Sequence, residues 1–235
     1  MEGRNVMTLN EYQKKRHFGV TPEPSGKASD SREKDFHLIY VVQKHRATNL
    51  HYDFRLEWHG TLLSWAVPKG PSLDPSVKRL AMQVEDHPID YANFEGVIPE
   101  GEYGGGTVMV WDKGTWEPEV EDVQAALQKG DLKFTLHGEK LKGSWVLVRT
   151  RGYGRSSDKS WLLIKHRDQF ASTGDVTEDA RSVVSKRLLA DIAREGEGDV
   201  AKAATGDPSS KSTAPKRSVR PKHAAVGAKT RKRAR

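Results

Sequence analysis

The chain has 235 residues, with 39 Lys or Arg, 32 Asp or Glu and no cysteine. The lack of cysteine excludes disulfides, thiolate nucleophiles and zinc–thiolate sites, so any metal must be held by His, Asp, Glu or carbonyl ligands. No apolar run approaches the roughly 20 residues that span a bilayer, and MEGRNVMTLNEYQKKRH lacks the apolar core of a signal peptide. We therefore expect an intracellular, soluble protein without a membrane partner.

The N-terminal segment, residues 1–35, is expected to form a helix followed by a linker. In TLNEYQKKRHF, Thr8 and Glu11 have the spacing of a capping box, which predicts a helix start at Thr8. The prolines and small polar residues of TPEPSGKASDSREKD then end the helix.

From Phe36 onward, short strand patterns alternate with turn signals. The predicted strands are FHLIYVVQKH, LHYDFRLEW, TLLSWAVP, KRLAMQVEDH, GTVMVWDKGTW, LKFTLHGEK, GSWVLVRT and SWLLIKH. Such a series favours a closed or nearly closed antiparallel barrel or a sandwich. We predict a mainly β fold: a compact antiparallel β-barrel of about eight strands over residues 36–172, with a few flanking helices and with the six tryptophans in its core and hairpins.

Two further segments have helical periodicity, VEDVQAALQKG and TEDARSVVSKRLLADIAREGEG, and the second predicts a C-terminal helix over residues 173–198. Residues 199–235 have little to bury and are expected to form a disordered polybasic tail. Residues 201–235 hold 11 Lys or Arg and one acid, whereas the preceding 200 residues carry 28 basic and 31 acidic groups. The tail can neutralise DNA phosphates without sequence preference; the alternative is a solubilising tail with no ligand.

Polar side chains share one face of the strand HYDFRLE, residues 51–57. His51, Asp53 and Arg55 lie opposite Tyr52 and Phe54, because successive strand side chains point to opposite faces. Other polar residues with the same alternation are His45, six positions upstream, and Arg79, Gln83, Glu85 and His87 in RLAMQVEDH. If these faces meet inside one barrel, its interior is polar.

Buried charges must be paired or must coordinate a metal. His45, His51 and Asp53 can supply two imidazoles and a carboxylate to one divalent ion. The groups left to surround an anion such as phosphate are Arg55, Arg79 and His87. A network of internal salt bridges is the alternative interpretation.

A second alternative is the facial triad of a non-haem iron oxygenase. His51-x-Asp53 with a distant His137 matches that ligand set, and Arg149 could bind a carboxylate cosubstrate. This interpretation leaves His45, Arg55 and His87 without a function.

The stretch FEGVIPEGEYGGGTVMVWD gathers five glycines around one loop that leads into a strand. A phosphate-binding P-loop needs GK[ST] entering a helix, so the pattern favours a tight barrel corner, which can also let a DNA backbone approach closely.

The motifs QKHRATNLHYDFRLE, VEDHPIDYANFEGVIPEGEYGGGTVMVWDKGTW, LKGSWVLVR and WLLIKH occur in this order between about Leu9 and about Ala171. Together they closely resemble the 3′-phosphoesterase domain of bacterial DNA ligase D. The resemblance implies a compact β-barrel with a manganese-dependent activity, for which Co²⁺ and Zn²⁺ also suit the ligands. Such enzymes remove a 3′-terminal ribonucleoside from a primer strand and then hydrolyse the remaining 3′-phosphate to a 3′-hydroxyl.

The same resemblance assigns roles to individual residues. It implies that His45, His51 and Asp53 bind the metal and that Arg55 and His87 contact phosphate. Further positions that the family uses are Arg79, Glu85, Tyr91, Arg16 and Glu23. The family usually has Asp where this chain has His17, a departure that concerns the ribonucleoside-removing step.

In multidomain relatives this module is joined to a polymerase and an ATP-dependent ligase, but the chain has no KxDG-type ligase nucleophile. We therefore expect a stand-alone factor that acts on DNA primer–template ends with a 3′-ribonucleotide or 3′-phosphate. It would work in the bacterial cytoplasm, at the nucleoid, beside a separate DNA ligase and Ku. The alternative from another class is a non-catalytic DNA-end-binding module, which has no need of a complete metal site.

Overall fold

The structure, a computed structural model, describes residues 5–26, 37–150 and 157–208. Its α-helices are α1 (Asn5–Lys14), α2 (Val123–Lys129), α3 (Leu189–Glu195) and α4 (Val200–Ala204). Its strands are β1 (Leu38–Arg46), β2 (Leu50–Trp58), β3 (Thr61–Val67), β4 (Lys78–Gln83), β5 (His87–Pro88), β6 (Gly96–Ile98), β7 (Gly106–Pro118), β8 (Asp131–Gly138), β9 (Lys142–Arg149) and β10 (Ser160–Lys165). Short 3₁₀ turns are η1 (Ile89–Asn93), η2 (Ser157–Lys159) and η3 (Val176–Glu178).

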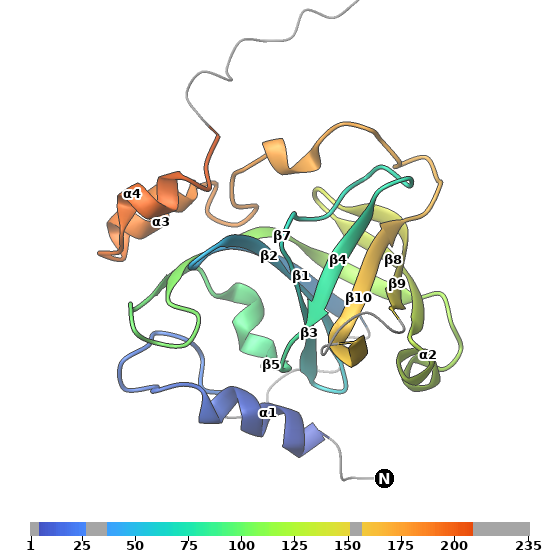
Figure 1. Ribbon diagram of the computed structural model, residues 1–235, viewed down its shortest axis with the longest axis horizontal. Coiled ribbons are helices and arrows are strands. Elements are labelled where there is room, and N and C mark those ends of the chain that lie inside the picture. The colour runs from blue at the N-terminus through green and yellow to red at the C-terminus, as the bar shows by residue number, and fades with distance from the viewer. Residues whose placement is uncertain (1–4, 27–36, 151–156, 209–235) are drawn as a thin grey trace, which may run out of the picture.

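Eight antiparallel strands close into a barrel (Figure 1). Their order is β1-β2-β3-β4-β10-β9-β8-β7, and pairing of β7 with β1 closes the ring. The two short strands lie outside this ring, β5 on β3 and β6 on β7. The predicted mainly β fold, with an antiparallel barrel of about eight strands and a few helices, is confirmed.

The barrel interior is apolar, contrary to the expected polar interior. Tyr52 and Phe54 of β2 point into a core with residues from β1, β3, β4 and β7–β10. Five of the six tryptophans are fully buried there: Trp65, Trp111, Trp116, Trp145 and Trp161. Because large aromatic rings fill the narrow interior, the alternation of β2 turns His51, Asp53 and Arg55 to the outside of the barrel.

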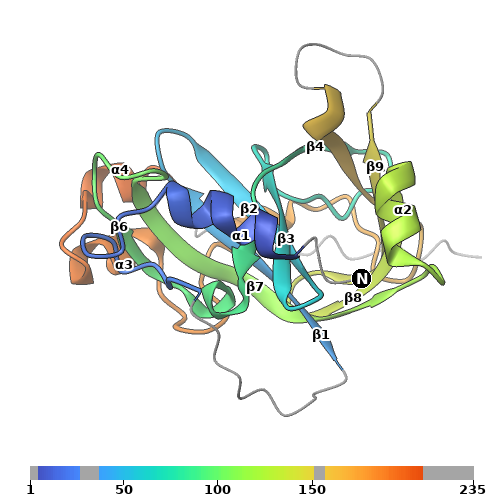
Figure 2. The same cartoon turned by 90° about the horizontal axis from the view of Figure 1, so that it is seen from below.

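A second layer covers the outer face of β1, β2 and β3. Figure 2, seen from below, shows α1 lying across these strands. Tyr12 of α1 packs with Val41, Leu62, Tyr91 and Phe94 in a second apolar cluster. The polar face of β2 is therefore buried between the barrel wall and the N-terminal segment rather than inside the barrel.

Helix α1 begins at Asn5, three residues before the predicted start at Thr8. Residues 5–7, NVM, include neither Gly nor Pro, so the helix continues upstream of Thr8, which is not its N-cap. Helix α2 agrees with the prediction: Asp122 accepts a hydrogen bond from the Ala125 N–H at its start, and Gly130 ends it with φ = 81°.

The predicted C-terminal helix over 173–198 is wrong in length, since only α3 and the 3₁₀ turn η3 form in this range. The segment between them is irregular. There the Ser182 hydroxyl accepts hydrogen bonds from the backbone N–H groups of Val184 and Ser185, and Lys186 has φ = 60°. A serine that bonds to nearby backbone groups competes with helix formation, which explains the break.

The chain is ordered for longer than predicted at its C-terminal end. Asp199 caps α4, and the Asp207 carboxylate accepts from the backbone N–H groups of Leu189 and Ala190 at the start of α3. The predicted disorder from residue 199 is therefore wrong for residues 199–208. Two further segments lie outside the described residues: residues 209–235, the rest of the predicted tail, and residues 27–36, around the end of the predicted N-terminal linker. Within the described part, no helix has the length and apolar character to cross a membrane.

Candidate metal and phosphate site

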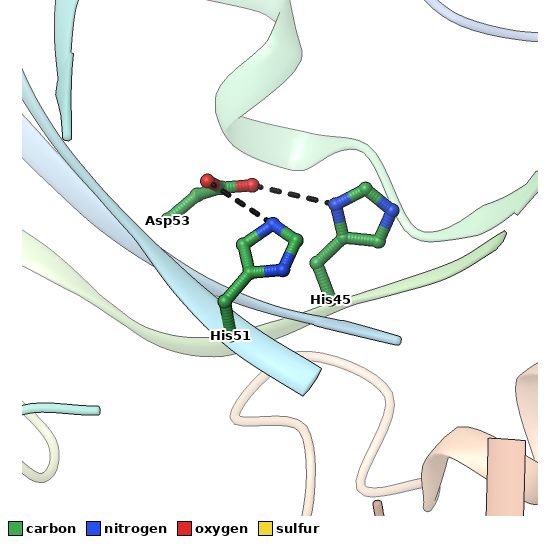
Figure 3. A group of neighbouring side chains, drawn as sticks. All are labelled: His45, His51 and Asp53. Carbon is green, nitrogen blue, oxygen red and sulfur yellow. Dashed lines mark ion pairs between the residues drawn. The ribbon is translucent and has the colours of Figure 1, made fainter. Parts of the chain in front are cut away.

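His45, His51 and Asp53 converge near the turn that joins β1 to β2. His45 pairs directly opposite His51 in the ladder, and Asp53 follows two residues later on the same face of β2. Figure 3 shows both rings pointing to the Asp53 carboxylate, with His45 Nδ1 3.6 Å from Oδ2 and His51 Nε2 3.7 Å from Oδ1. One ligand atom from each residue lies within 4.8 Å of the others, so the group could bind a metal.

The geometry and the protonation of this group suit a divalent ion. Bonds of about 2.0–2.2 Å to one ion place neighbouring ligand atoms roughly 3–3.5 Å apart, close to the two His–Asp distances of 3.6 and 3.7 Å. His45 Nε2 lies 2.8 Å from the Gly104 carbonyl oxygen, and His51 Nδ1 lies 3.0 Å from that of Asn49. If each of these nitrogens carries the ring proton, the other nitrogen presents its lone pair to the site. The two backbone carbonyls thus fix the tautomers that metal binding requires.

The charges around the group favour the same protonation state. Burial alone would raise the pKa of Asp53, but Arg55 and the two imidazoles outweigh it and hold that pKa far below its ordinary range. Burial lowers the pKa of His51 below its ordinary value, although Asp53 opposes this effect. The carboxylate is therefore ionised and the His51 ring neutral near pH 7.

Arg55 is held by three neighbours before any substrate arrives. Its Nε donates to Gln43 Oε1 at 2.8 Å, its Nη1 to Ser64 Oγ at 2.8 Å and its Nη2 to Asp53 Oδ2 at 3.1 Å. Gln43 is itself fixed, since its Nε2 donates to the carbonyl oxygens at 91 and 94. The Arg55 guanidinium is therefore held in one orientation beside the metal group, which is the name used below for His45, His51 and Asp53. A fixed, planar guanidinium is suited to contact a phosphate.

His87 on β5 is buried between two guanidinium groups. Its Nδ1 lies 2.9 Å from Arg55 Nη1 and 2.9 Å from the Glu85 carbonyl oxygen, and its Nε2 lies 3.3 Å from Arg16 Nη2. Burial, followed by the positive charges of Arg55 and Arg16, holds the pKa of His87 well below its ordinary value. The ring is therefore neutral at physiological pH and available as a hydrogen-bonding group.

The N-terminal segment brings a second arginine to the site. Arg16 Nε donates to Glu23 Oε1 at 2.8 Å, and its Nη1 lies 3.4 Å from Glu85 Oε1. The Tyr91 hydroxyl donates to the same Glu23 oxygen at 3.0 Å, and the Arg16 guanidinium lies 3.8 Å from the Tyr12 ring centroid. These contacts join the segment after α1 to β5 and η1.

One cavity of about 320 Å³ contains most of the predicted site residues. Its lining includes Arg16, His45, His51, Asp53, Arg55, Glu85, His87 and Tyr91. Gln43 and Ser64, which orient Arg55, were missed from the sequence. Gln43 has the same strand parity as His45 and could have been found from it, whereas no local pattern marks Ser64.

Two predicted residues do not line this cavity. Glu23 lies behind Arg16 and acts on the site through it. Arg79 pairs with Leu163 in the β4–β10 ladder. It lies near Asp175, whose pKa is lowered first by hydrogen bonds with Thr177 and then by the charge of Arg79. The predicted common face of residues 79–87 is interrupted because β4 ends at 83 and an irregular link precedes β5. Arg79 is thus not brought together with the other phosphate-binding candidates.

The two distant residues of the oxygenase alternative, His137 and Arg149, lie apart from His51 and Asp53. His137 on β8 is half exposed and pairs with Glu117 at 3.5 Å, and Arg149 packs on Trp161. Neither side chain lines the cavity, so the structure does not form that facial triad. His17 also points away: its ring is 79% exposed and its Nδ1 lies 3.0 Å from Glu102 Oε2.

Comparison with known proteins agrees with this geometry. Residues 43–149 match the model of the DNA ligase D 3′-phosphoesterase domain. This part of the chain, a little under half of it, is therefore similar to the DNA ligase D 3′-phosphoesterase domain. The matched residues of this chain include the metal group, Arg55, His87 and Tyr91, whereas Arg16 and Glu23 precede the match.

Three relatives have the phosphoesterase region within longer chains. The chain is 54% identical over 193 residues to the multifunctional non-homologous end joining protein LigD of Pseudomonas aeruginosa, covering 80% of this chain and 22% of that protein. It is 43% identical over 144 residues to the multifunctional non-homologous end joining DNA repair protein LigD of Mycobacterium tuberculosis, covering 61% and 18%. It is 40% identical over 169 residues to the LigD protein of Mycolicibacterium smegmatis, covering 68% and 21%. The chain thus spans about a fifth of the length of these relatives.

Proposed function

We propose that the chain is a metal-dependent 3′-phosphoesterase that prepares DNA ends for non-homologous end joining. Its substrates are primer–template ends with a 3′-terminal ribonucleoside or a 3′-phosphate, and its product is a ligatable 3′-hydroxyl. The observation that carries the proposal is the group of His45, His51 and Asp53, which shares one pocket with Arg55 and His87. The names of the relatives support the role in end joining.

The proposed ion is Mn²⁺, with Co²⁺ or Zn²⁺ compatible with the same ligands. His45 Nδ1, His51 Nε2 and a carboxylate oxygen of Asp53 would hold it. When bound, the ion supplies Lewis-acid stabilisation of a phosphoryl oxygen.

The protein side chains provide the remaining chemistry. Arg55 and Arg16 present guanidinium N–H groups to the other phosphate oxygens, in a buried site where charge interactions are weakly screened. Because Arg55 is already oriented by Gln43, Ser64 and Asp53, little reorganisation opposes its action as charge develops in the transition state.

His87 is assigned the transfer of a proton to the leaving oxygen. It begins as a neutral ring between two guanidinium groups. A bound phosphate adds negative charge to the same space, which offsets the arginines and raises the pKa of the ring. His87 then takes up a proton from solvent and donates it to the leaving oxygen as that bond breaks, while a water molecule forms the new bond to phosphorus and releases its own proton to solvent.

DNA is the proposed macromolecular partner. The basic excess of residues 201–235 provides sequence-independent attraction to phosphates. A separate ligase and Ku are proposed to act with the chain at the bacterial nucleoid, because the relatives are named for end joining.

The test is a time course on a 5′-labelled primer strand that ends in one ribonucleotide and is annealed to a template. With Mn²⁺ we expect loss of the ribonucleoside, then conversion of the 3′-phosphate to a 3′-hydroxyl; with EDTA we expect neither. On a second primer that ends in a 3′-phosphate, conversion to the 3′-hydroxyl while the ribonucleotide-ended primer stays intact would locate a defect in the first step, which the His17 departure concerns. Retained binding without hydrolysis in Mn²⁺, Co²⁺ and Zn²⁺ would contradict the proposal and favour a non-catalytic DNA-end-binding module.

A further inference from the structure

The loop between β6 and β7 places an exposed aromatic ring at the edge of the candidate site. Tyr103 and Gly104 both line the cavity that contains the metal group. The exposed large apolar or aromatic side chains of the described residues are Val20, Leu80, Tyr103, Phe170 and Val184, and Tyr103 is the one among them that lines this cavity. Tyr103 is 49% exposed, so its ring is not buried in the core.

The loop around Tyr103 has a backbone conformation that requires glycine at several positions. Gly101 and Gly104 have φ values of 93° and 80°, which are left-handed conformations that other residues rarely adopt. A Cβ atom on Gly105 would lie 2.8 Å from the Pro99 carbonyl oxygen. Since the carbonyl of Gly104 also holds His45, the loop sets the position of Tyr103 relative to a metal ligand.

Two cations lie beside the ring. Lys15 Nζ is 4.8 Å and the Arg16 guanidinium carbon is 5.6 Å from the centroid of Tyr103. The next residue, His17, pairs with Glu102, so three consecutive residues of the N-terminal segment touch the loop. An aromatic ring next to cations at the edge of a phosphate site is the combination with which proteins hold the end of a single nucleic acid strand.

We propose that Tyr103 stacks on the terminal nucleoside of the strand whose 3′-phosphodiester lies in the pocket. This inference rests on the proposed function and deepens it, because it names a residue that holds the leaving nucleoside. Stacking uses the face that every base has, so Tyr103 should give little preference among the four bases. Tyr103 is a positioning residue: it holds the nucleoside, while the phosphodiester bond that breaks lies beside the metal group.

The test uses a primer–template whose terminal ribonucleoside carries 2-aminopurine, a base whose fluorescence falls when it stacks. The wild-type protein in EDTA, where no hydrolysis is expected, should quench the probe. Tyr103→Ala should abolish the quenching and weaken binding of this end about tenfold. Tyr103→Phe keeps the ring and should retain both. Phe170→Ala removes an aromatic residue of similar exposure outside the pocket and should change neither.

The outcomes separate this inference from the function on which it rests. If Tyr103→Ala quenches and binds like the wild-type protein, or if the wild-type protein hydrolyses the end in Mn²⁺ but does not quench the probe, stacking by Tyr103 is wrong and the phosphoesterase function stands. If the wild-type protein neither quenches the probe nor hydrolyses the end, both are wrong. Equal quenching loss in Tyr103→Ala and Tyr103→Phe would assign the effect to the hydroxyl and overturn stacking.

Discussion

At the scale of single residues, the candidate site is organised by hydrogen bonds to the backbone as much as by its charges. The Gly104 and Asn49 carbonyls select the nitrogen that each histidine turns to Asp53. Arg55 then compensates the Asp53 charge at 3.1 Å, so the carboxylate stays ionised beside the two imidazole rings. The candidate metal ligands are thus largely preformed, and protonation of the rings should control metal affinity.

The pH dependence of metal binding follows from His51. The neutral ring binds metal, so affinity is full above the pKa of the ring and falls away as pH drops through it. Burial places that pKa below its ordinary value, so the midpoint of the weakening should lie below the ordinary histidine pKa of about 6.5. Titration of Mn²⁺ by calorimetry between pH 5 and pH 8 checks this. A fall in affinity already between pH 8 and pH 7 would contradict it.

At the scale of elements, the β1–β2 hairpin carries all three candidate metal ligands, and the N-terminal segment contributes Arg16 to the same pocket. The alternation of β2 was sufficient to predict that His51, Asp53 and Arg55 share a face. The contacts of Arg16 with Glu85 join residues 69 positions apart, and no local pattern predicts them. The N-terminal residues could be named only from the family resemblance.

Glu23 tests whether this segment stabilises the site. Its side chain is fully buried and accepts from Arg16 and Tyr91, so Glu23→Gln leaves the Arg16 charge without its closest partner. Loss of one member of a buried pair costs about 3 kcal/mol, which predicts a melting temperature lower by roughly 6–12 °C. Phosphoesterase activity should fall with it, because Arg16 loses its orientation.

The matched control is Glu117→Gln, which removes an acid whose side chain is 68% exposed and pairs with the half-exposed His137. An exposed pair contributes little, so its melting temperature should stay unchanged. Equal stability of both variants by differential scanning calorimetry would show that the Arg16–Glu23 pair does not hold the segment in place.

At the scale of the whole molecule, the sequence predicted the barrel but not which of its two faces is the interior. Both faces of β2 contain bulky side chains, and the alternation of polar and apolar residues is the same in either orientation. The choice depends on how five tryptophans from four strands fill one small space. The prediction for the C-terminal region was wrong for a related reason. Periodicity predicted one regular helix, but the hydrogen bonds of Ser182 interrupt it, and α4 packs against α3.

The tail should strengthen DNA binding without changing the chemistry. Residues 209–235 hold ten Lys or Arg and no acid, and a truncation after 208 keeps Asp207, which binds the start of α3. The truncation should weaken binding and flatten the dependence of log affinity on log salt by about 0.7–0.9 for each phosphate that the tail had neutralised. Fluorescence anisotropy at low and at moderate salt measures this slope; an unchanged slope would mean that the tail does not touch DNA.

The most direct test of the account compares His51→Ala with the wild-type protein on two substrates, a primer ending in a ribonucleotide and the same primer ending in a 3′-phosphate. If one metal group serves both hydrolytic steps, the variant should lose both rates to the same extent in saturating Mn²⁺, while its DNA binding in EDTA stays at the wild-type level. Retention of either rate by His51→Ala would contradict the assignment of the His45–His51–Asp53 group as the shared centre.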